Sequence, residues 1–251
     1  MAIYPDLRDR VVLVTGGGSG IGEAIVRQFA AQRAKVGFID IAVEPARDLV
    51  RELESSGMTA HFEACDLTDI PALKRAVAAI RARLGPIEVL VNNAANDDRH
   101  ATEEVTEALW DERVAVNLKH QFFCAQAVLP DMKSAGRGSI VNLGSISWMT
   151  GVGGMAGYTA CKSGVLGLTR SLARDFGGYG IRVNAVAPGW IMTARQLEKW
   201  FTPEGERQAM AAQCLKRRLQ PDEMARFIVF LASEEASACT GQHYVVDGGW
   251  A

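Results

Sequence analysis

Short apolar segments alternate with longer amphipathic segments along the whole chain. The apolar segments are rich in β-branched residues, as is typical of strands buried on both faces of a parallel sheet. Seven strands are predicted, at residues 10–15, 35–40, 59–64, 87–91, 139–143, 181–187 and 243–247. The predicted helices end near residue 33 and span about 44–55, 69–84, 106–134, 156–176 and 221–232. This alternation predicts one α/β domain, residues 1–251, with helices on both faces of a doubly wound, seven-stranded parallel sheet.

Residues 196–220 interrupt the alternation. Trp200, Phe201, Pro203 and Gly205 stand among helix-forming residues there, and no apolar strand pattern is present. Such a segment is expected to be a mobile lid rather than a sheet crossover. We therefore predict a substrate lid at about residues 190–220.

Composition excludes several classes of function. Lys and Arg total 27 against 29 Asp and Glu, so neither a nucleic acid nor a membrane surface is an expected partner. Hydrophobic content of 48% and charged content of 22% are ordinary for a soluble globular protein. The sequence has no signal-peptide pattern and no apolar run long enough to span a bilayer.

The cysteines and histidines show no metal-binding spacing. The five cysteines are scattered and form no Cys-x-x-Cys, and the four histidines are equally dispersed. Scattered cysteines in odd number fit small apolar residues of a reducing compartment better than disulfides or zinc ligands. We expect a cytoplasmic protein without a bound metal.

A glycine-rich turn at residues 16–22 lies between the first strand and the helix that follows it. Glycines let the backbone turn sharply and approach a ligand closely, and the first N–H groups of a helix attract a diphosphate. Asp40 ends the second strand, twenty residues beyond Gly20. This arrangement is typical of a Rossmann-like dinucleotide site, in which the acidic residue accepts the hydroxyls of the adenosine ribose.

Asp40 also bears on the choice of cofactor. A carboxylate at this position would repel a 2'-phosphate, and neither Gly18 nor Ile41 offers a compensating cation. We therefore expect NAD rather than NADP. The alternative is that Asp40 simply caps the following helix.

Further polar residues follow the carboxyl ends of later strands, the edge at which open α/β sheets bind ligands. Asp66 is expected beside the adenine. Residues 96–100 read Asn-Asp-Asp-Arg-His after the fourth strand. They form either a solvated loop or a wall that hydrogen-bonds a polyhydroxylated substrate.

The segment 144–162 holds the candidate chemistry. Tyr158 and Lys162 are four residues apart, so a helix would place both side chains on one face. A cation beside a phenol favours the phenolate and brings proton transfer closer to neutral pH. Ser145 could add a hydroxyl to the same volume. An ordinary amphipathic helix with a surface lysine is the alternative.

Asn117 lies amid apolar neighbours in the predicted helix over about 106–134. A buried amide must find hydrogen-bond partners. It is either a satisfied polar group of the core or part of a proton path.

Taken together, these motifs resemble the short-chain dehydrogenase/reductase family over essentially the full length. The matching residues are Thr15, Gly16, Gly20, Gly22, Asp66, Leu67, Asn92, Asn93, Ala94, Asn117, Ser145, Tyr158, Lys162, Pro188, Gly189, Thr193 and Val246 to Gly249. Ala95 departs from the family, which usually has glycine there.

The resemblance implies a mechanism and a tetramer. Tyr158 as phenolate would remove the proton of a substrate hydroxyl while hydride passes to the nicotinamide. Lys162 would lower the tyrosine pKa and bind the nicotinamide ribose, Ser145 would orient the substrate oxygen, and Asn117 would hold a water that links Lys162 to solvent. Homotetramers of this family commonly form through two long helices and the C-terminal segment.

The resemblance also implies that Thr193 and Ile191 contact the nicotinamide carboxamide. The full set of expected cofactor contacts comprises Gly16, Ser19, Gly20, Ile21, Asp40, Ile41, Asp66, Leu67, Asn93, Tyr158, Lys162, Pro188, Ile191 and Thr193.

Within the family, residues 93–100, 144–148, 188–190 and 212–218 look like those of NAD-dependent sugar 1-dehydrogenases acting on xylose, arabinose, galactose or rhamnose. On that hypothesis an aldose is oxidised at its anomeric hydroxyl to a lactone. Trp148 and Trp190 would flank the pocket with flat apolar faces, and Asn96 and Ser147 would meet sugar hydroxyls. Apolar loop packing is the alternative for both tryptophans.

Two other functions fit the same residues. One is a reductase of small ketones or 3-oxoacyl thioesters, although Asp97 and Asp98 argue against a basic patch for a phosphopantetheine group. The other is a catalytically silent NAD(H)-sensing binding protein.

Overall fold

A parallel sheet runs through the centre of the computed structural model, which describes residues 2–251. Within those residues the sheet has seven strands in the order β3-β2-β1-β4-β5-β6-β7, all pairs being parallel. The strands are β1 Val11–Thr15, β2 Lys35–Asp40, β3 Ala60–Ala64, β4 Ile87–Asn92, β5 Gly138–Leu143, β6 Ile181–Pro188 and β7 His243–Val246. The predicted fold class is confirmed, and each predicted strand is present.

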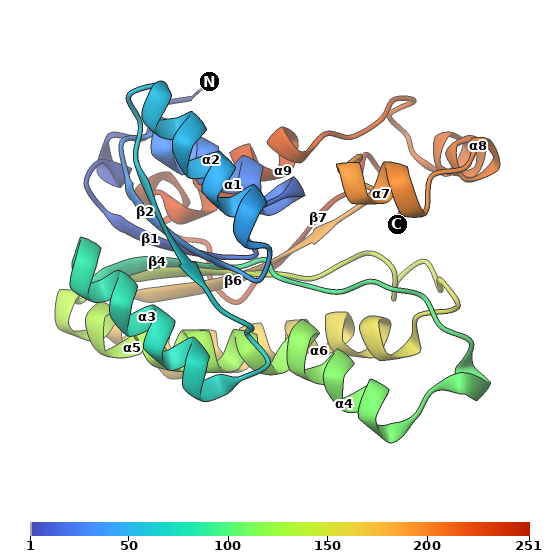
Figure 1. Cartoon of the computed structure of the whole chain (residues 1–251), viewed down its shortest axis with the longest axis horizontal. Coiled ribbons are helices and arrows are strands. Elements are labelled where there is room, and N and C mark those ends of the chain that lie inside the picture. Colours follow the sequence, from blue (N-terminus) through green and yellow to red (C-terminus); the bar gives the residue numbers. More distant parts are fainter. Residues whose placement is uncertain (1) are drawn as a thin grey trace.

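Helices cover both faces of the sheet (Figure 1). Helices α1 Gly20–Ala31, α2 Val43–Ser55 and α9 Pro221–Ala232 pack on one face, and α3 Ile70–Leu84, α5 His120–Ala135 and α6 Ala156–Phe176 on the other. Short 3₁₀ turns lie at Pro5–Leu7, Thr102–Glu104, Gly177–Tyr179 and Glu234–Ala236. In the described part of the chain, no helix combines the length and apolar character that crossing a bilayer demands.

The apolar run of β1 explains how the two layers of core form. All five of its residues are buried. Successive side chains of a strand point to opposite faces. Val12 and Val14 therefore join the core under α1 and α9, whereas Val11 and Leu13 join the core under α3 and α5.

The helical region predicted over about 106–134 is divided into three parts. Helix α4 covers Glu107–Val114, a π-helical turn covers Ala115–Lys119, and α5 begins at His120. Asn117 lies in the π turn and is fully buried. Single π turns inside α-helices are frequent at functional sites.

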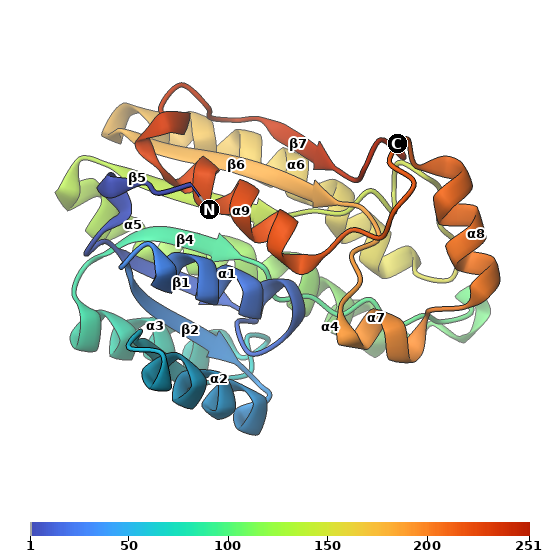
Figure 2. The same ribbon diagram turned by 90° about the horizontal axis from the view of Figure 1, so that it is seen from above.

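Residues 190–220 form two short helices over the carboxyl edge of the sheet (Figure 2). They are α7 Ala194–Lys199 and α8 Pro203–Ala212. Thr193 and Thr202 cap these helices with their side chains. A bridge between Ile191 and Leu219 brings the two ends of the excursion together. The segment is therefore a folded flap joined to the sheet at a narrow base.

Candidate active site

A cavity of about 1270 Å³ lies at the carboxyl edge of the sheet. Every residue expected at the cofactor lines it, from Gly16 in the first turn to Thr193 at the start of α7. Ser145, Tyr158 and Lys162 line the same cavity, as do Asn96, Ser147 and Trp190. Asn117 and Trp148 do not.

The glycine turn is shaped for a close backbone approach. Gly16 and Gly20 have φ angles of 66° and 58°, a region that favours glycine. A Cβ on Gly22 would lie 1.7 Å from the carbonyl oxygen of Gly16. The first N–H of α1 to bond back along the helix is that of Glu23, to Ser19. The N–H groups before it are free of helix hydrogen bonds, so the turn fits a diphosphate.

Asp40 is held at the edge of the cavity by the backbone. Its two carboxylate oxygens accept from the N–H groups of Gly18 and Ala42, each at 2.8 Å. Each oxygen keeps a further lone pair for a ligand hydroxyl. Ala42 is the N-cap residue of α2, so Asp40 also bonds the backbone at the start of that helix, as the alternative hypothesis expects. Asp40 lines the cavity as well, so its carboxylate is placed for both roles.

Asn93 ties β4 to the glycine turn. Its side-chain amide donates to the carbonyl oxygens of Thr15 and Gly16 at 3.0 and 2.9 Å. The hydroxyl of Thr15 accepts in turn from the backbone N–H groups of Asn93 and Ala94. The turn is thus supported from the neighbouring strand, a role for Thr15 that the sequence motif alone did not indicate.

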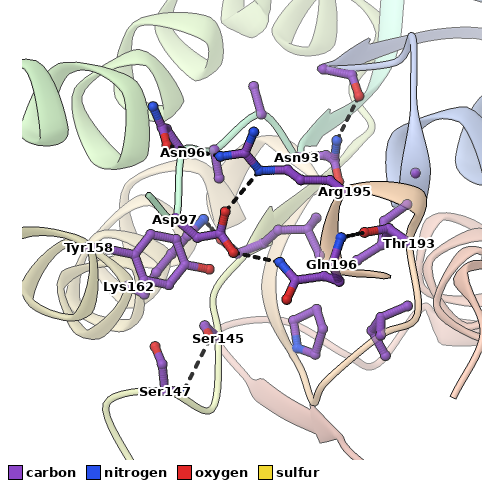
Figure 3. A pocket seen from close by; sticks show the side chains of 18 of the residues that line it. Asn93, Asn96, Asp97, Ser145, Ser147, Tyr158, Lys162, Thr193, Arg195 and Gln196 are labelled. Atoms are coloured by element: carbon purple, nitrogen blue, oxygen red, sulfur yellow. Dashed lines mark hydrogen bonds and ion pairs between the residues drawn. The ribbon is translucent and has the colours of Figure 1, made fainter. Parts of the chain in front are cut away.

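Tyr158 and Lys162 lie on one face of α6, with Ser145 on the loop after β5 (Figure 3). Lys162 is 1% exposed, and its Nζ donates to the carbonyl oxygen of Leu143 at 2.7 Å. That nitrogen lies 5.6 Å from the centroid of the Tyr158 ring. The ammonium group is therefore held by the end of β5 and lies near the tyrosine ring.

The pKa of Tyr158 departs from the expected direction. Burial raises the pKa of Tyr158 to about 12, a hydrogen bond with Ser145 opposes the rise, and the charge of Asp97 adds to it. Burial also lowers the pKa of Lys162 to about 8, against the opposing effects of Cys161 and Asp97. The four-residue spacing brought the two side chains together, but burial raises the pKa of Tyr158 in this protein.

The side chain of Asn117 is fully used. Its Oδ1 accepts from the N–H of Asn96 at 2.9 Å, and its Nδ2 donates to the carbonyl oxygens of Asn96 and Arg113 at 3.1 and 3.0 Å. Asn117 is thus a satisfied core polar group that fixes the loop after β4. A water held by Asn117, and the proton path from Lys162 to solvent through it, remain predictions.

Two neighbouring residues expected at the substrate have different positions. Ser147 is 8% exposed and lines the cavity, and its buried Oγ has no hydrogen-bond partner among residues 2–251. Trp148 does not line the cavity, which corrects the expectation that it flanks the pocket. Its ring packs against His243, with 6.4 Å between the ring centroids, because the chain turns back after Ile146.

The flap is joined to the loop after β4 by four charged side chains. Arg195 donates from its Nε to Asp97 at 3.1 Å and from its Nη2 to Asp98 at 2.6 Å. Lys199 donates to Asp98 at 3.0 Å. This pairing, across about a hundred residues of sequence, was not predicted. Opposite charges in the two segments were the only sequence signal for it.

The site so described is matched by known proteins. A family model described as enoyl-(acyl carrier protein) reductase covers residues 16–251. A D-xylose 1-dehydrogenase of Caulobacter vibrioides is 51% identical over 249 residues, which is 99% of this chain and 98% of that protein. This chain belongs to the short-chain dehydrogenase/reductase family. The predicted resemblance is confirmed.

Two further relatives of this short-chain dehydrogenase show the range of the family. A probable galactose dehydrogenase of Rhizobium meliloti is 48% identical, over 98% of this chain and 96% of that protein. A 7α-hydroxysteroid dehydrogenase solved with NADH and 7-oxo glycochenodeoxycholic acid is 31% identical, with a TM-score of 0.94 over 98% of this chain and 96% of that one. This short-chain dehydrogenase is thus an oxidoreductase of a family that uses nicotinamide dinucleotides.

The residues of this short-chain dehydrogenase fit such a cofactor. The glycine turn leaves room for a diphosphate, and Asp40 has free acceptor sites for ribose hydroxyls. The described residues contain no group of three or more His, Cys, Asp or Glu side chains that could hold a metal ion.

Proposed function

We propose that this short-chain dehydrogenase oxidises the anomeric hydroxyl of an aldose to a lactone with NAD. The observation that carries the proposal is one continuous cavity with Asp40 at one end and the Ser145 and Tyr158 hydroxyls at the other. The xylose and galactose dehydrogenases among the relatives, both matched over nearly their full length, support the choice of substrate.

NAD is proposed over NADP because of the wall around Asp40. Its neighbours along the cavity, Ile41, Ala42 and Asp66, carry no positive charge that could pair with a 2'-phosphate. The carboxylate of Asp40 would repel that phosphate and accept hydrogen bonds from a free 2'-hydroxyl.

The proposed chemistry belongs to four side chains. The bound oxidised nicotinamide supplies the hydride acceptor. Tyr158 removes the proton of the substrate hydroxyl, and Ser145 holds both the substrate oxygen and the tyrosine hydroxyl. Lys162 stabilises the phenolate electrostatically and binds the nicotinamide ribose. Asn117 would link Lys162 to solvent through a water at its backbone carbonyl.

The substrate is proposed to lie between Asn96, Ser147 and Trp190. The buried hydroxyl of Ser147 has no partner among residues 2–251, so a hydrogen bond with a ligand in the cavity would satisfy it, and the Trp190 indole offers a flat apolar face to a sugar ring. The flap over residues 190–220 is proposed to act as the lid that excludes water during turnover.

A homotetramer and a cytoplasmic location are also proposed. Phe122 on α5 is 40% exposed, so this long helix presents apolar surface that a second copy could cover. Five free cysteines fit a reducing compartment.

The test is a substrate panel followed by NADH absorbance. The purified protein is given NAD or NADP with aldoses, polyols and secondary alcohols, and NADH with ketones and 3-oxoacyl thioesters. Aldose oxidation with NAD is expected. Activity confined to ketones or thioesters would replace the proposal with the reductase function. NADH binding without turnover on any substrate would replace it with the sensor.

A further inference from the structure

The carboxylate of Asp97 lies beside Tyr158 in the cavity, although Asp97 belongs to the loop after β4 (Figure 3). Gln196 of α7 donates from its Nε2 to Asp97 Oδ2 at 2.6 Å. Arg195 donates from its Nε to Asp97 Oδ1 at 3.1 Å. Two segments almost a hundred residues apart in sequence thus hold one carboxylate at the substrate end of the cavity.

Trp190 fixes the direction of the Gln196 amide. The indole Nε1 of Trp190 donates to Gln196 Oε1 at 2.9 Å, so the NH₂ group of that amide must point to Asp97. All three side chains line the cavity. The chain of hydrogen bonds from Trp190 through Gln196 to Asp97 orients the carboxylate before any ligand arrives, which lowers the cost of binding.

The remaining capacity of Asp97 defines what it can bind. An ionised carboxylate offers about four acceptor sites and no donor. Two of those sites are used by Gln196 and Arg195. A ligand group that meets the others must donate a hydrogen bond, as a sugar hydroxyl does and a carboxylate or phosphate does not. Hydrogen bonds to a charged acceptor are also the stronger ones.

Asp98 has a different position, although it is the adjacent residue with the same side chain. It accepts from Arg195 at 2.6 Å and from Lys199 at 3.0 Å, and it does not line the cavity. Asp98 therefore anchors α7 to the loop, whereas Asp97 is held by α7 and lines the cavity.

We propose that Asp97, oriented by Gln196, accepts hydrogen bonds from ring hydroxyls of the aldose other than the anomeric one, and so determines which sugars are oxidised. Asp97 is a specificity residue in this proposal, and Gln196 is its positioning residue. The proposal rests on the proposed aldose oxidation and names the part of the site that distinguishes one aldose from another.

The test compares an aldose with its 2-, 3- and 4-deoxy analogues. For the wild type, kcat/KM should fall about 10- to 100-fold on the analogue that lacks the hydroxyl bound by Asp97. Asp97→Asn should lose a similar factor on the intact sugar and lose little more on that analogue. Gln196→Met should show a smaller loss of the same discrimination, because the carboxylate remains but is no longer oriented.

Asp98→Asn is the matched control. It weakens the anchoring of α7 and should alter KM for all the sugars by a common factor while keeping the wild-type discrimination. Asp97→Ala repeats the test with no polar group on the side chain of residue 97. NADH binding by this variant checks that it folds.

Two results would overturn the assignment. One is wild-type discrimination retained in both Asp97 variants, and the other is equal loss of discrimination in Asp98→Asn, which would make the effect one of flap anchoring. A wild type that oxidises no aldose would instead refute the proposed function itself, together with this assignment.

Discussion

The Nζ of Lys162 lies 5.6 Å from the centroid of the Tyr158 ring and donates to the carbonyl oxygen of Leu143. The lysine is therefore anchored to the end of β5 while its ammonium group stays near the tyrosine ring. Burial raises the pKa of Tyr158 most, Ser145 lowers it, and the charge of Asp97 raises it. The pKa of Tyr158 thus depends on burial, on Ser145 and on Asp97, and each of these two side chains can be changed by itself.

Removing the phenolic hydroxyl should nearly abolish turnover. Tyr158→Phe is expected to lower kcat by about 10²- to 10⁴-fold, the range of general acid–base catalysis. NADH binding should change little, because the diphosphate turn and Asp40 are untouched. Steady-state kinetics and fluorescence titration with NADH measure the two effects. A Phe variant with wild-type kcat would remove Tyr158 from the chemistry.

Oxidation should become faster as the pH rises. Burial raises the pKa of Tyr158 to about 12 in the free protein, so the phenolate fraction grows with pH over the alkaline range. Asp97 raises this pKa and Ser145 lowers it, so Asp97→Asn should move the kcat/KM profile to lower pH and Ser145→Ala to higher pH. Lys162 faces the same group, and because burial lowers its pKa to about 8, it is charged at neutral pH and loses that charge over the alkaline range, which opposes the rise in rate.

Profiles measured from about pH 6 to about pH 10 test these shifts. Lys119→Gln, a change at a lysine that does not line the cavity, provides the control. A profile that stays in place in both the Asp97 and Ser145 variants would show that neither side chain acts on the titrating group.

Asp40→Ala should erode the preference for NAD over NADP. The variant loses hydrogen bonds to the ribose and no longer repels a 2'-phosphate, so the ratio of the two kcat/KM values should fall about 10-fold or more. Asp66→Asn is the control, since Asp66 is expected on the adenine side of the site and accepts hydrogen bonds from Thr68. It should weaken both cofactors alike. An unchanged preference for NAD over NADP in Asp40→Ala would show that Asp40 does not distinguish a ribose 2'-hydroxyl from a 2'-phosphate.

The glycine turn can be tested through stability. A Cβ on Gly22 would meet the carbonyl oxygen of Gly16 at 1.7 Å and the side-chain nitrogen of Asn93 at 2.6 Å, and a backbone carbonyl cannot easily move away. Gly22→Ala should destabilise the protein by at least about 1–3 kcal/mol and weaken NADH binding.

Gly167→Ala is the matched change, because a Cβ there has nothing within 4 Å and the residue lies inside α6. It should stabilise by about 0.5–1 kcal/mol. Thermal unfolding measures the Tm of both variants. Equal Tm values would contradict the steric argument.

The strands and the glycine turn could be predicted because their signals are local. The buried run of β1 and the acidic end of β2 each carry their meaning within a few residues. The position of Tyr158 relative to Lys162 follows from helix geometry alone. These parts of the fold and of the site needed no knowledge of the packing.

The parts that the sequence did not predict depend on tertiary packing. The Arg195 pairs with Asp97 and Asp98 join segments that only the folded chain brings together. Trp148 packs on His243 because of a turn whose direction the sequence pattern did not specify. The pKa of Tyr158 rises because burial, which no spacing reveals, outweighs its neighbours.

Transfer of deuterium from a labelled sugar tests the central claim most directly. The protein is given NAD and an aldose deuterated at the anomeric carbon, and the reduced cofactor and the sugar product are analysed by mass spectrometry. An aldose deuterated at carbon 2 serves as the control. The account predicts deuterium in the NADH and a lactone from the first sugar, and unlabelled NADH from the second. Label arriving from carbon 2, or no transfer from either sugar, would contradict it.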